Sequence, residues 1–302
     1  MKNVKSRFFA LKNSMKDFLL LLRPHQWLKN LFIFFPAFFG LKILDGDVFL
    51  KSASAFIGFC FLASALYIFN DLHDIHEDQT HPEKKNRPLA AGKVSKEAAK
   101  VGSSFLIILG FMIFAFGETS ALWLAVLYVC INILYTLWLK HISIIDVVII
   151  ASGFVIRIFV GSFVTGIPLS MWIVLMTFLF ALFIALAKRH DDVRIFLESG
   201  QKTRKSVDGY NLEFLNFSLA MLATISVVSY IMYTTSPEVI SRLHSDKLYL
   251  TSGFVILGFM RYMQLTLVEK KSHSPTEVLL KDNFIQFCVL GWGICLFFLL
   301  YE

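Results

Sequence analysis

Cysteine is scarce in this chain, and its four residues show no pattern of a site. They lie in apolar stretches, and no two of them have C-x-x-C spacing: Cys60, Cys130, Cys288 and Cys295. Such cysteines are most simply small hydrophobic side chains. The sequence therefore supports neither a disulfide framework nor a zinc site.

A recognisable secretory signal is also missing. Residues 1–22 are basic and mixed, and they contain no apolar core that ends in small residues. We expect this segment to form an amphipathic lead-in on the cytosolic side.

Acidic residues are fewer than basic ones. The chain has 22 Asp and Glu and 29 Lys and Arg, which gives a net charge of +7. A basic excess can indicate nucleic-acid binding. Cytoplasmic loops of membrane proteins are also basic, and anionic headgroups attract them. Because the apolar content favours this second explanation, we expect no nucleic-acid partner.

Apolar residues are what the chain has in abundance. Hydrophobic residues make up 56% of it, Phe alone accounts for 32, and the mean hydropathy is +0.65. Several windows approach the roughly 20 apolar residues that span a bilayer. We predict an all-α, polytopic membrane protein with nine transmembrane helices around a central cavity, at about 27–44, 48–69, 98–117, 120–139, 144–166, 170–188, 213–234, 248–268 and 283–301.

The placement of Lys and Arg predicts the orientation of these spans. With nine spans, most of the 29 basic residues fall on one side, and the other side holds only Lys42, Lys51, Arg242 and Lys247. We therefore expect a cytoplasmic N-terminus, a multi-pass protein of the cytoplasmic (inner) membrane and a site that faces the cytoplasm. Residues 23–302 would form one transmembrane domain, with two charged cap segments, 70–97 and 188–212, over its cavity.

A dense acidic motif follows the second predicted span. If that helix continues, Asn70, Asp74 and Asp78 are spaced i, i+4 and i+8 and share one face. Mg²⁺ prefers a few carboxylates together with substrate phosphates, so we predict that these three residues hold Mg²⁺ and that Asp71 supports them. The alternative is an ordinary solvated helix end. The spacing of His73, His76 and His81 does not fit a metal site. We expect these side chains at the surface, or in contact with the metal ligands without binding the metal themselves.

Cations surround this motif and predict a ligand with phosphate groups. Lys84 and Arg87 follow it, and Arg23 and Lys29 precede the first span. Arg204 and Lys205 form a second cationic cluster in the later cap segment. Interfacial anchoring and the positive-inside rule predict cations at the same places, so these residues alone do not discriminate.

Polar residues within or beside the spans cost free energy when they contact lipid, so they usually face the interior of the helix bundle or a water-filled site. Arg157 is the clearest case, and Asp146 is a candidate partner in a structural ion pair. The remaining candidates are two residues at the end of span four and four at the end of span six: Tyr135, Lys140, Lys188, Arg189, Asp191 and Asp192. A local helix salt bridge between Lys188 and Asp192 is the alternative for the last group.

The motif Asn-Asp-x-x-Asp-x-x-x-Asp over 70–78, with the basic Arg-Pro-Leu-Ala-Ala-Gly segment at 87–92, resembles the UbiA superfamily of intramembrane prenyltransferases. Further segments resemble its polyprenyl-phosphate (decaprenyl-phosphate) phosphoribosyltransferase branch; they cover 23–30, 139–141, 152–157, 186–189 and, ending in Tyr210, 205–210. The resemblance implies transfer of 5-phosphoribose from phosphoribosyl pyrophosphate to a polyprenyl phosphate, with Mg²⁺ as cofactor, for cell-envelope glycan synthesis.

One departure from the superfamily pattern bears on the donor. Ordinary members carry a second Asp-x-x-x-Asp motif, but here Asp191 and Asp192 are followed four residues later by Ile195 and Phe196, and Glu198 is the nearest other carboxylate. This favours a phosphorylated sugar donor over a prenyl diphosphate. A prenyltransferase acting on an acceptor such as 4-hydroxybenzoate is the alternative, and a membrane transporter ranks below it.

Overall fold

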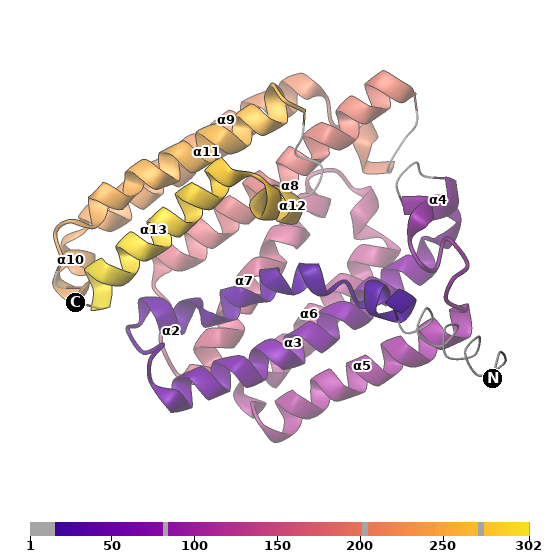
Figure 1. Ribbon diagram of the computed structural model, residues 1–302, viewed down its shortest axis with the longest axis horizontal. Coiled ribbons are helices and arrows are strands. Elements are labelled where there is room, and N and C mark those ends of the chain that lie inside the picture. The colour runs from indigo at the N-terminus through magenta and orange to yellow at the C-terminus, as the bar shows by residue number, and fades with distance from the viewer. Residues whose placement is uncertain (1–15, 81–83, 201–204, 244, 271–274, 302) are drawn as a thin grey trace, which may run out of the picture. The chain divides into compact units, whose positions relative to one another are not determined.

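The computed structural model describes residues 16–80, 84–200, 205–243, 245–270 and 275–301, and every regular element in these ranges is a helix (Figure 1). The predicted all-α class is therefore confirmed. Most of the predicted lead-in, residues 1–15, lies outside the described residues.

Two compact units make up the chain, and each is described by itself. Unit 1 comprises Met1–Leu137 and Arg157–Ile167, and unit 2 comprises Trp138–Ile156 and Pro168–Glu302. The division between them runs through one helix, α7 (Ile145–Thr165). The single domain expected for 23–302 stays a prediction.

Among the described residues, unit 1 contains helical residues 16–22, the end of α7 and these elements: η1 (Pro24–Phe34), α2 (Phe35–Phe39), α3 (Gly46–His73), α4 (Ile75–Thr80), η2 (Lys84–Asn86), α5 (Lys96–Phe116), η3 (Thr119–Ala121) and α6 (Leu122–Leu137). Figure 1 shows α3 and α5 running side by side, and contacts along their length agree. Small residues make this approach possible, because a Cβ added to Gly110 would lie 2.7 Å from Leu62.

The helix that leads to the acidic motif has a well-defined start. The side chain of Asp45 accepts hydrogen bonds from the backbone N–H groups of Asp47 (2.9 Å) and Val48 (3.3 Å), so it caps α3. From there α3 runs for 28 residues, past the predicted end of the span at 69. The first polar residues of the motif consequently lie on the helix itself.

In unit 2 the described residues form the start of α7 and these elements: η4 (Leu139–His141), α8 (Met171–Ser199), η5 (Lys205–Gly209), α9 (Leu212–Thr235), α10 (Pro237–Leu243), η6 (Leu248–Thr251), α11 (Ser252–Leu267), α12 (Pro275–Lys281) and α13 (Asn283–Tyr301). Buried apolar residues such as Phe183, Leu215 and Leu219 pack α8 against α9. α11 packs against α13 in the same unit.

Seven helices among the described residues are long and apolar enough to cross a membrane: 46–73, 96–116, 119–137, 145–165, 171–199, 212–235 and 283–300. They match seven of the nine predicted windows. The other two windows contain η1 with α2, and the 16-residue α11, which are shorter. The nine-span topology and its orientation stay predictions.

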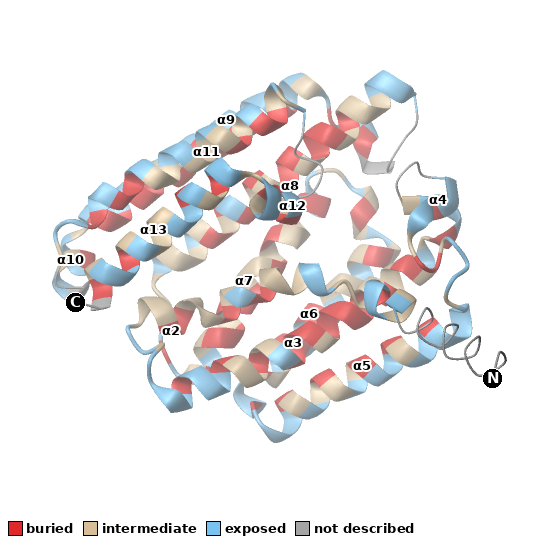
Figure 2. Ribbon diagram, in the orientation of Figure 1, coloured by how far each residue is buried: buried red, intermediate tan, exposed pale blue. Residues whose placement is uncertain are grey.

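Many large apolar side chains face outward on these helices. Phe105 is 58% exposed, Phe217 70% and Leu290 63%. Figure 2 shows exposed residues recurring along α5, α9 and α13, the helices that carry these three side chains. Apolar surfaces of this kind suit a lipid environment better than water.

Candidate active site

The acidic motif spans the junction of α3 and α4, and helical spacing persists across it. The N–H of Asp74 donates to the carbonyl of Asn70 (2.9 Å), and the N–H of Asp78 donates to the carbonyl of Asp74 (2.8 Å). The expected one-turn intervals are therefore present. The side chains nevertheless divide into two groups.

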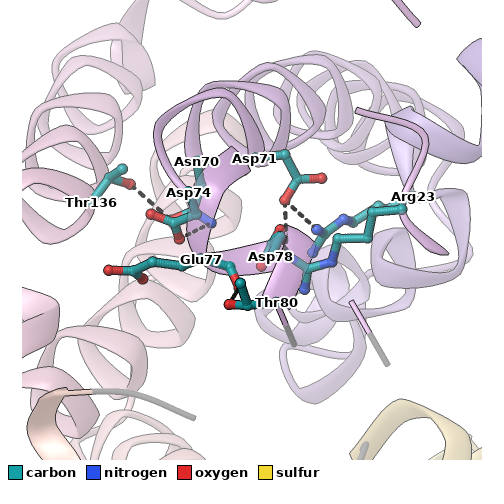
Figure 3. Close-up of polar contacts among 9 residues, drawn as sticks. Arg23, Asn70, Asp71, Asp74, Glu77, Asp78, Thr80 and Thr136 are labelled. Atoms are coloured by element: carbon teal, nitrogen blue, oxygen red, sulfur yellow. Dashed lines mark hydrogen bonds and ion pairs between the residues drawn. The ribbon is translucent and has the colours of Figure 1, made fainter. Parts of the chain in front are cut away.

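The first group contains Asn70 and Asp74. The amide Nδ2 of Asn70 donates to Oδ2 of Asp74 (3.1 Å), and the hydroxyl of Thr136, on α6, donates to Oδ1 of Asn70 (3.4 Å). Figure 3 shows Glu77 on the same side of the helix as these two residues. This side offers amide, carboxylate and hydroxyl oxygens.

The second group holds Asp71 and Asp78 against two arginines (Figure 3). Oδ1 of Asp71 accepts from Arg23 (2.5 Å) and from Arg87 (3.1 Å), and Oδ2 of Asp78 accepts from Arg87 (2.6 Å). Both carboxylates are buried, at 2% and 3% exposure. Buried charges need such partners, so these ion pairs fix the motif to the segments before and after it.

The first group suits a hard cation only in part. Among the described residues no three His, Cys, Asp or Glu side chains gather into a metal site. Asn70 and Asp74 do supply oxygen donors, which are the ligands that Mg²⁺ prefers when substrate phosphates complete its coordination. These two side chains therefore supply only part of the oxygen ligands that Mg²⁺ requires.

A second buried charge cluster lies in unit 2, around Arg189 on α8. Its Nε donates to Oδ2 of Asp146 (2.5 Å), and its Nη1 donates to Oδ2 of Asp192 (2.7 Å). The side chain of Arg189 is only 1% exposed. Such an arginine holds two acids in fixed positions.

Tyr210 completes this cluster. Its hydroxyl donates to Oδ1 of Asp146 (2.7 Å) and accepts from the backbone N–H of Ile144 (2.6 Å). Burial, and the carboxylate of Asp146 beside it, raise the pKa of Tyr210 above its usual range, so the phenol stays protonated at neutral pH. Ile144 has φ 69°, a conformation that a β-branched residue rarely adopts.

The later acids of α8 have cationic partners as well. Oδ1 of Asp191 accepts from Arg194 (3.2 Å), and Glu198 accepts from Lys270 (3.0 Å). The carboxylate of Glu198 is 52% exposed. The C-terminal part of α8, which ends at Ser199, is therefore charged.

Arg157, the predicted intramembrane cation, is buried in unit 1 at 4% exposure. Its Nε donates to Oδ1 of Asn30 (2.8 Å), and its Nη2 donates to the hydroxyl of Tyr128 (2.9 Å). Asp146, its suggested partner, binds Arg189 and Tyr210. Each of the two charges therefore has close polar contacts within its own unit.

The remaining predicted residues differ in how far each is buried. Lys84, Tyr135 and Lys188 are half-buried, and Lys140 is buried. His73 and His76 are exposed, as expected for surface residues. Arg204, the side chain of Lys205 and His81 lie outside the described residues.

Three residues of these groups escaped the sequence prediction as site residues: Glu77, Tyr128 and Thr136. Tyr128 and Thr136 lie in a strongly apolar span, so their polarity was a usable signal. Their partners are far away in the chain, and the pairing could not be read from spacing.

The chain is similar in sequence to known proteins. Residues 33–288 match the model of the UbiA prenyltransferase family. The chain is 30% identical to the decaprenyl-phosphate phosphoribosyltransferase of Mycolicibacterium smegmatis, covering 93% of this chain and 91% of that protein. It is 31% identical to the enzyme of the same name from Corynebacterium glutamicum, with 96% and 88% covered.

The fold has a solved counterpart. The structure of a UbiA homolog from Archaeoglobus fulgidus, bound to GPP and Mg²⁺, superposes with a TM-score of 0.71 at 20% identity and covers 93% of this chain and 99% of that one. The family match and the apolar helices together define a multi-pass membrane transferase. The chain belongs to the UbiA prenyltransferase family.

Proposed function

We propose that this chain transfers 5-phosphoribose from phosphoribosyl pyrophosphate to the phosphate of a polyprenyl phosphate. The observation that carries the proposal is its 30–31% identity, over more than nine-tenths of its length, to two decaprenyl-phosphate phosphoribosyltransferases. The missing second Asp-x-x-x-Asp motif supports the same donor. The product would be a polyprenyl-phosphoryl phosphoribose, which supplies a pentose for cell-envelope glycans.

The reaction exchanges one C–O bond for another. The bond from C1 of the ribose to pyrophosphate breaks with its electron pair leaving on pyrophosphate, and a phosphate oxygen of the lipid bonds to C1. That oxygen is already anionic, so the protein needs to position it more than to deprotonate it. No general base is required.

Asn70 and Asp74 would hold the metal, and Asp78, whose Oδ2 accepts from Arg87, is the third proposed ligand. A bound Mg²⁺ would stabilise negative charge on the departing pyrophosphate. Asp71 supports the ligands by holding Arg23 and Arg87 beside them. Glu77 is available as a further oxygen donor on the side of Asp74.

Within each unit, cations and polar groups are proposed to bind and orient phosphate. In unit 1 these are Arg23, Lys29, Lys84, Arg87, Tyr135 and Arg157; in unit 2 they are Lys140, Lys188, Arg189, Arg204, Lys205 and Tyr210, with Asp191 and Asp192 positioning their neighbours. Phosphoribosyl pyrophosphate is a soluble metabolite of the cytoplasm. We accordingly propose a site that faces the cytoplasm from the inner membrane.

The test is transfer of label from phosphoribosyl pyrophosphate to polyprenyl phosphate by the purified protein. Asp74→Asn removes the proposed metal-binding charge and should lower the rate about 100-fold or more. Asp47→Asn is the matched control, because the same change is made at an exposed acid in the first turn of α3. Equal rates for the two variants would contradict the role of Asp74.

A second candidate is a prenyltransferase that joins a prenyl diphosphate to an aromatic acceptor such as 4-hydroxybenzoate. The family description and the GPP-bound Archaeoglobus fulgidus homolog favour it. Consumption of a prenyl diphosphate, with no label transferred from phosphoribosyl pyrophosphate, would establish this activity in place of the first.

A further inference from the structure

Lys29 is distinctive among the cations of unit 1. It lies on η1 and is half-buried. Arg23 and Arg87 form salt bridges with carboxylates, whereas Lys29 forms none with the residues that the structure describes. A half-buried lysine without a carboxylate partner is suited to bind an anion from outside the chain.

Two other cations reinforce the positive potential at Lys29. Arg157 and Arg23 both act electrostatically on its ammonium group. Arg157 is held by the amide of Asn30 and the hydroxyl of Tyr128, and its Cζ lies 5.2 Å from the ring centroid of Phe59. These three neutral groups hold the guanidinium in place.

The chain that follows Lys29 is strongly aromatic. Five phenylalanines lie between residues 32 and 39. Phe32 stacks on Phe35 with ring centroids 4.4 Å apart, and Phe39 lies 5.8 Å from Phe35 and 5.1 Å from Phe38. A free sugar phosphate gains little from such rings, whereas an isoprenoid tail is stabilised by apolar contact. The neighbourhood favours an anion with an apolar tail.

We propose that Lys29, with Arg23 and Arg157 beside it, binds the phosphate monoester of the lipid acceptor, and that the phenylalanines of η1 and α2 contact its isoprenoid tail. The identity of the acceptor rests on the proposed function. The donor also carries a phosphate monoester, at its 5-position, and the experiment distinguishes the two sources. Asn30 and Tyr128 are positioning residues in this arrangement, since they act through Arg157.

The test is direct binding to the purified protein in detergent, without catalysis. Farnesyl phosphate, farnesol and phosphoribosyl pyrophosphate with Mg²⁺ are titrated separately into the wild type and into Lys29→Gln, Lys29→Arg and Lys51→Gln. Lys51 is the matched control, because it is an exposed lysine that pairs with Asp47 at the start of α3. Thermal melting of each variant verifies that it is folded.

We expect Lys29→Gln to weaken farnesyl phosphate binding about tenfold or more, since a charged hydrogen bond is lost. Lys29→Arg should keep most of the affinity, Lys51→Gln all of it, and farnesol binding should not depend on Lys29. Weaker binding of phosphoribosyl pyrophosphate alone, or no change for either phosphate, would overturn the inference. If farnesyl phosphate binds through Lys29 while no phosphoribose is transferred, the proposed function fails and this site stands.

Discussion

At the scale of single residues, buried charges in this chain occur in groups that fix one another. Arg189 lies between Asp146 and Asp192, and Asp71 lies between Arg23 and Arg87. Removing one member of such a group leaves a buried charge without its partner, which is usually costly. We therefore expect substitutions in these groups to affect folding as well as activity.

Tyr210 provides a test of this expectation. Tyr210→Phe removes a hydrogen bond to a carboxylate and the acceptor for the N–H of Ile144, so it should lower the free energy of unfolding by about 1–3 kcal/mol. The measurement is thermal or denaturant unfolding in detergent. Tyr249→Phe is the control, because Tyr249 is 51% exposed, and it should change stability by less than about 0.5 kcal/mol. Equal stability of both variants would show that the cluster does not anchor Ile144.

The composition of the acidic motif, its helical spacing and the neighbouring cations were all predictable from the sequence. The division of its side chains was not. Asp71 and Asp78 pair with Arg87, which lies beyond a turn, and Asp146 pairs with Arg189 across 43 positions of the chain. Such pairs depend on how helices pack, and spacing within one helix carries no information about them.

At the scale of elements, the least regular segment is η1, an 11-residue 3₁₀ helix where the sequence predicted the first span. Runs of this length are uncommon, because 3₁₀ hydrogen bonds are less favourable than those of an α-helix. Two residues of α7 pack onto it: Arg157 binds Asn30, and Gly161 lies against the carbonyl of Ile33. Hydropathy alone does not reveal this conformation.

Gly161 is therefore expected to be intolerant of a side chain. A Cβ at this position would lie 2.0 Å from the carbonyl oxygen of Ile33, so Gly161→Ala should destabilise the protein by about 1–3 kcal/mol. Gly253→Ala, on α11 with open space around it, should leave the melting temperature unchanged or slightly higher. Identical melting of the two variants would rule out the close contact.

Seven predicted spans were confirmed as helices because long apolar runs have few other ways to fold in lipid. Their ends were less predictable. α8 continues to Ser199, beyond the predicted end at 188, and Gly200 then terminates it with φ 70°. The first part of the later cap segment is thus helix. Several of its charged residues pair with neighbours one turn away, with Asp146 or with Lys270.

At the scale of the whole molecule, the nine-span topology predicts on which side of the membrane each loop lies. If 27–44 and 248–268 both span, Lys16 and Lys42 lie on opposite sides, and so do Lys247 and Lys281. All four residues are exposed. Single-cysteine substitutions at these positions, in a variant without the native cysteines, can be probed with an impermeant maleimide on intact cells.

The nine-span prediction expects labelling at positions 42 and 247 and none at 16 and 281, because the basic side faces the cytoplasm. Labelling at both 16 and 42 would show that the first predicted span, 27–44, does not cross the membrane. Labelling at both 247 and 281 would show the same for the eighth predicted span, 248–268.

The central claim concerns the transferred group, and the most direct measurement is the intact mass of the lipid product when both donors compete. The purified protein is given phosphoribosyl pyrophosphate, a prenyl diphosphate, polyprenyl phosphate and 4-hydroxybenzoate with Mg²⁺. The account predicts polyprenyl-phosphoryl phosphoribose and pyrophosphate, with the prenyl diphosphate left intact. Prenylated 4-hydroxybenzoate, or no covalent product at all, would contradict it.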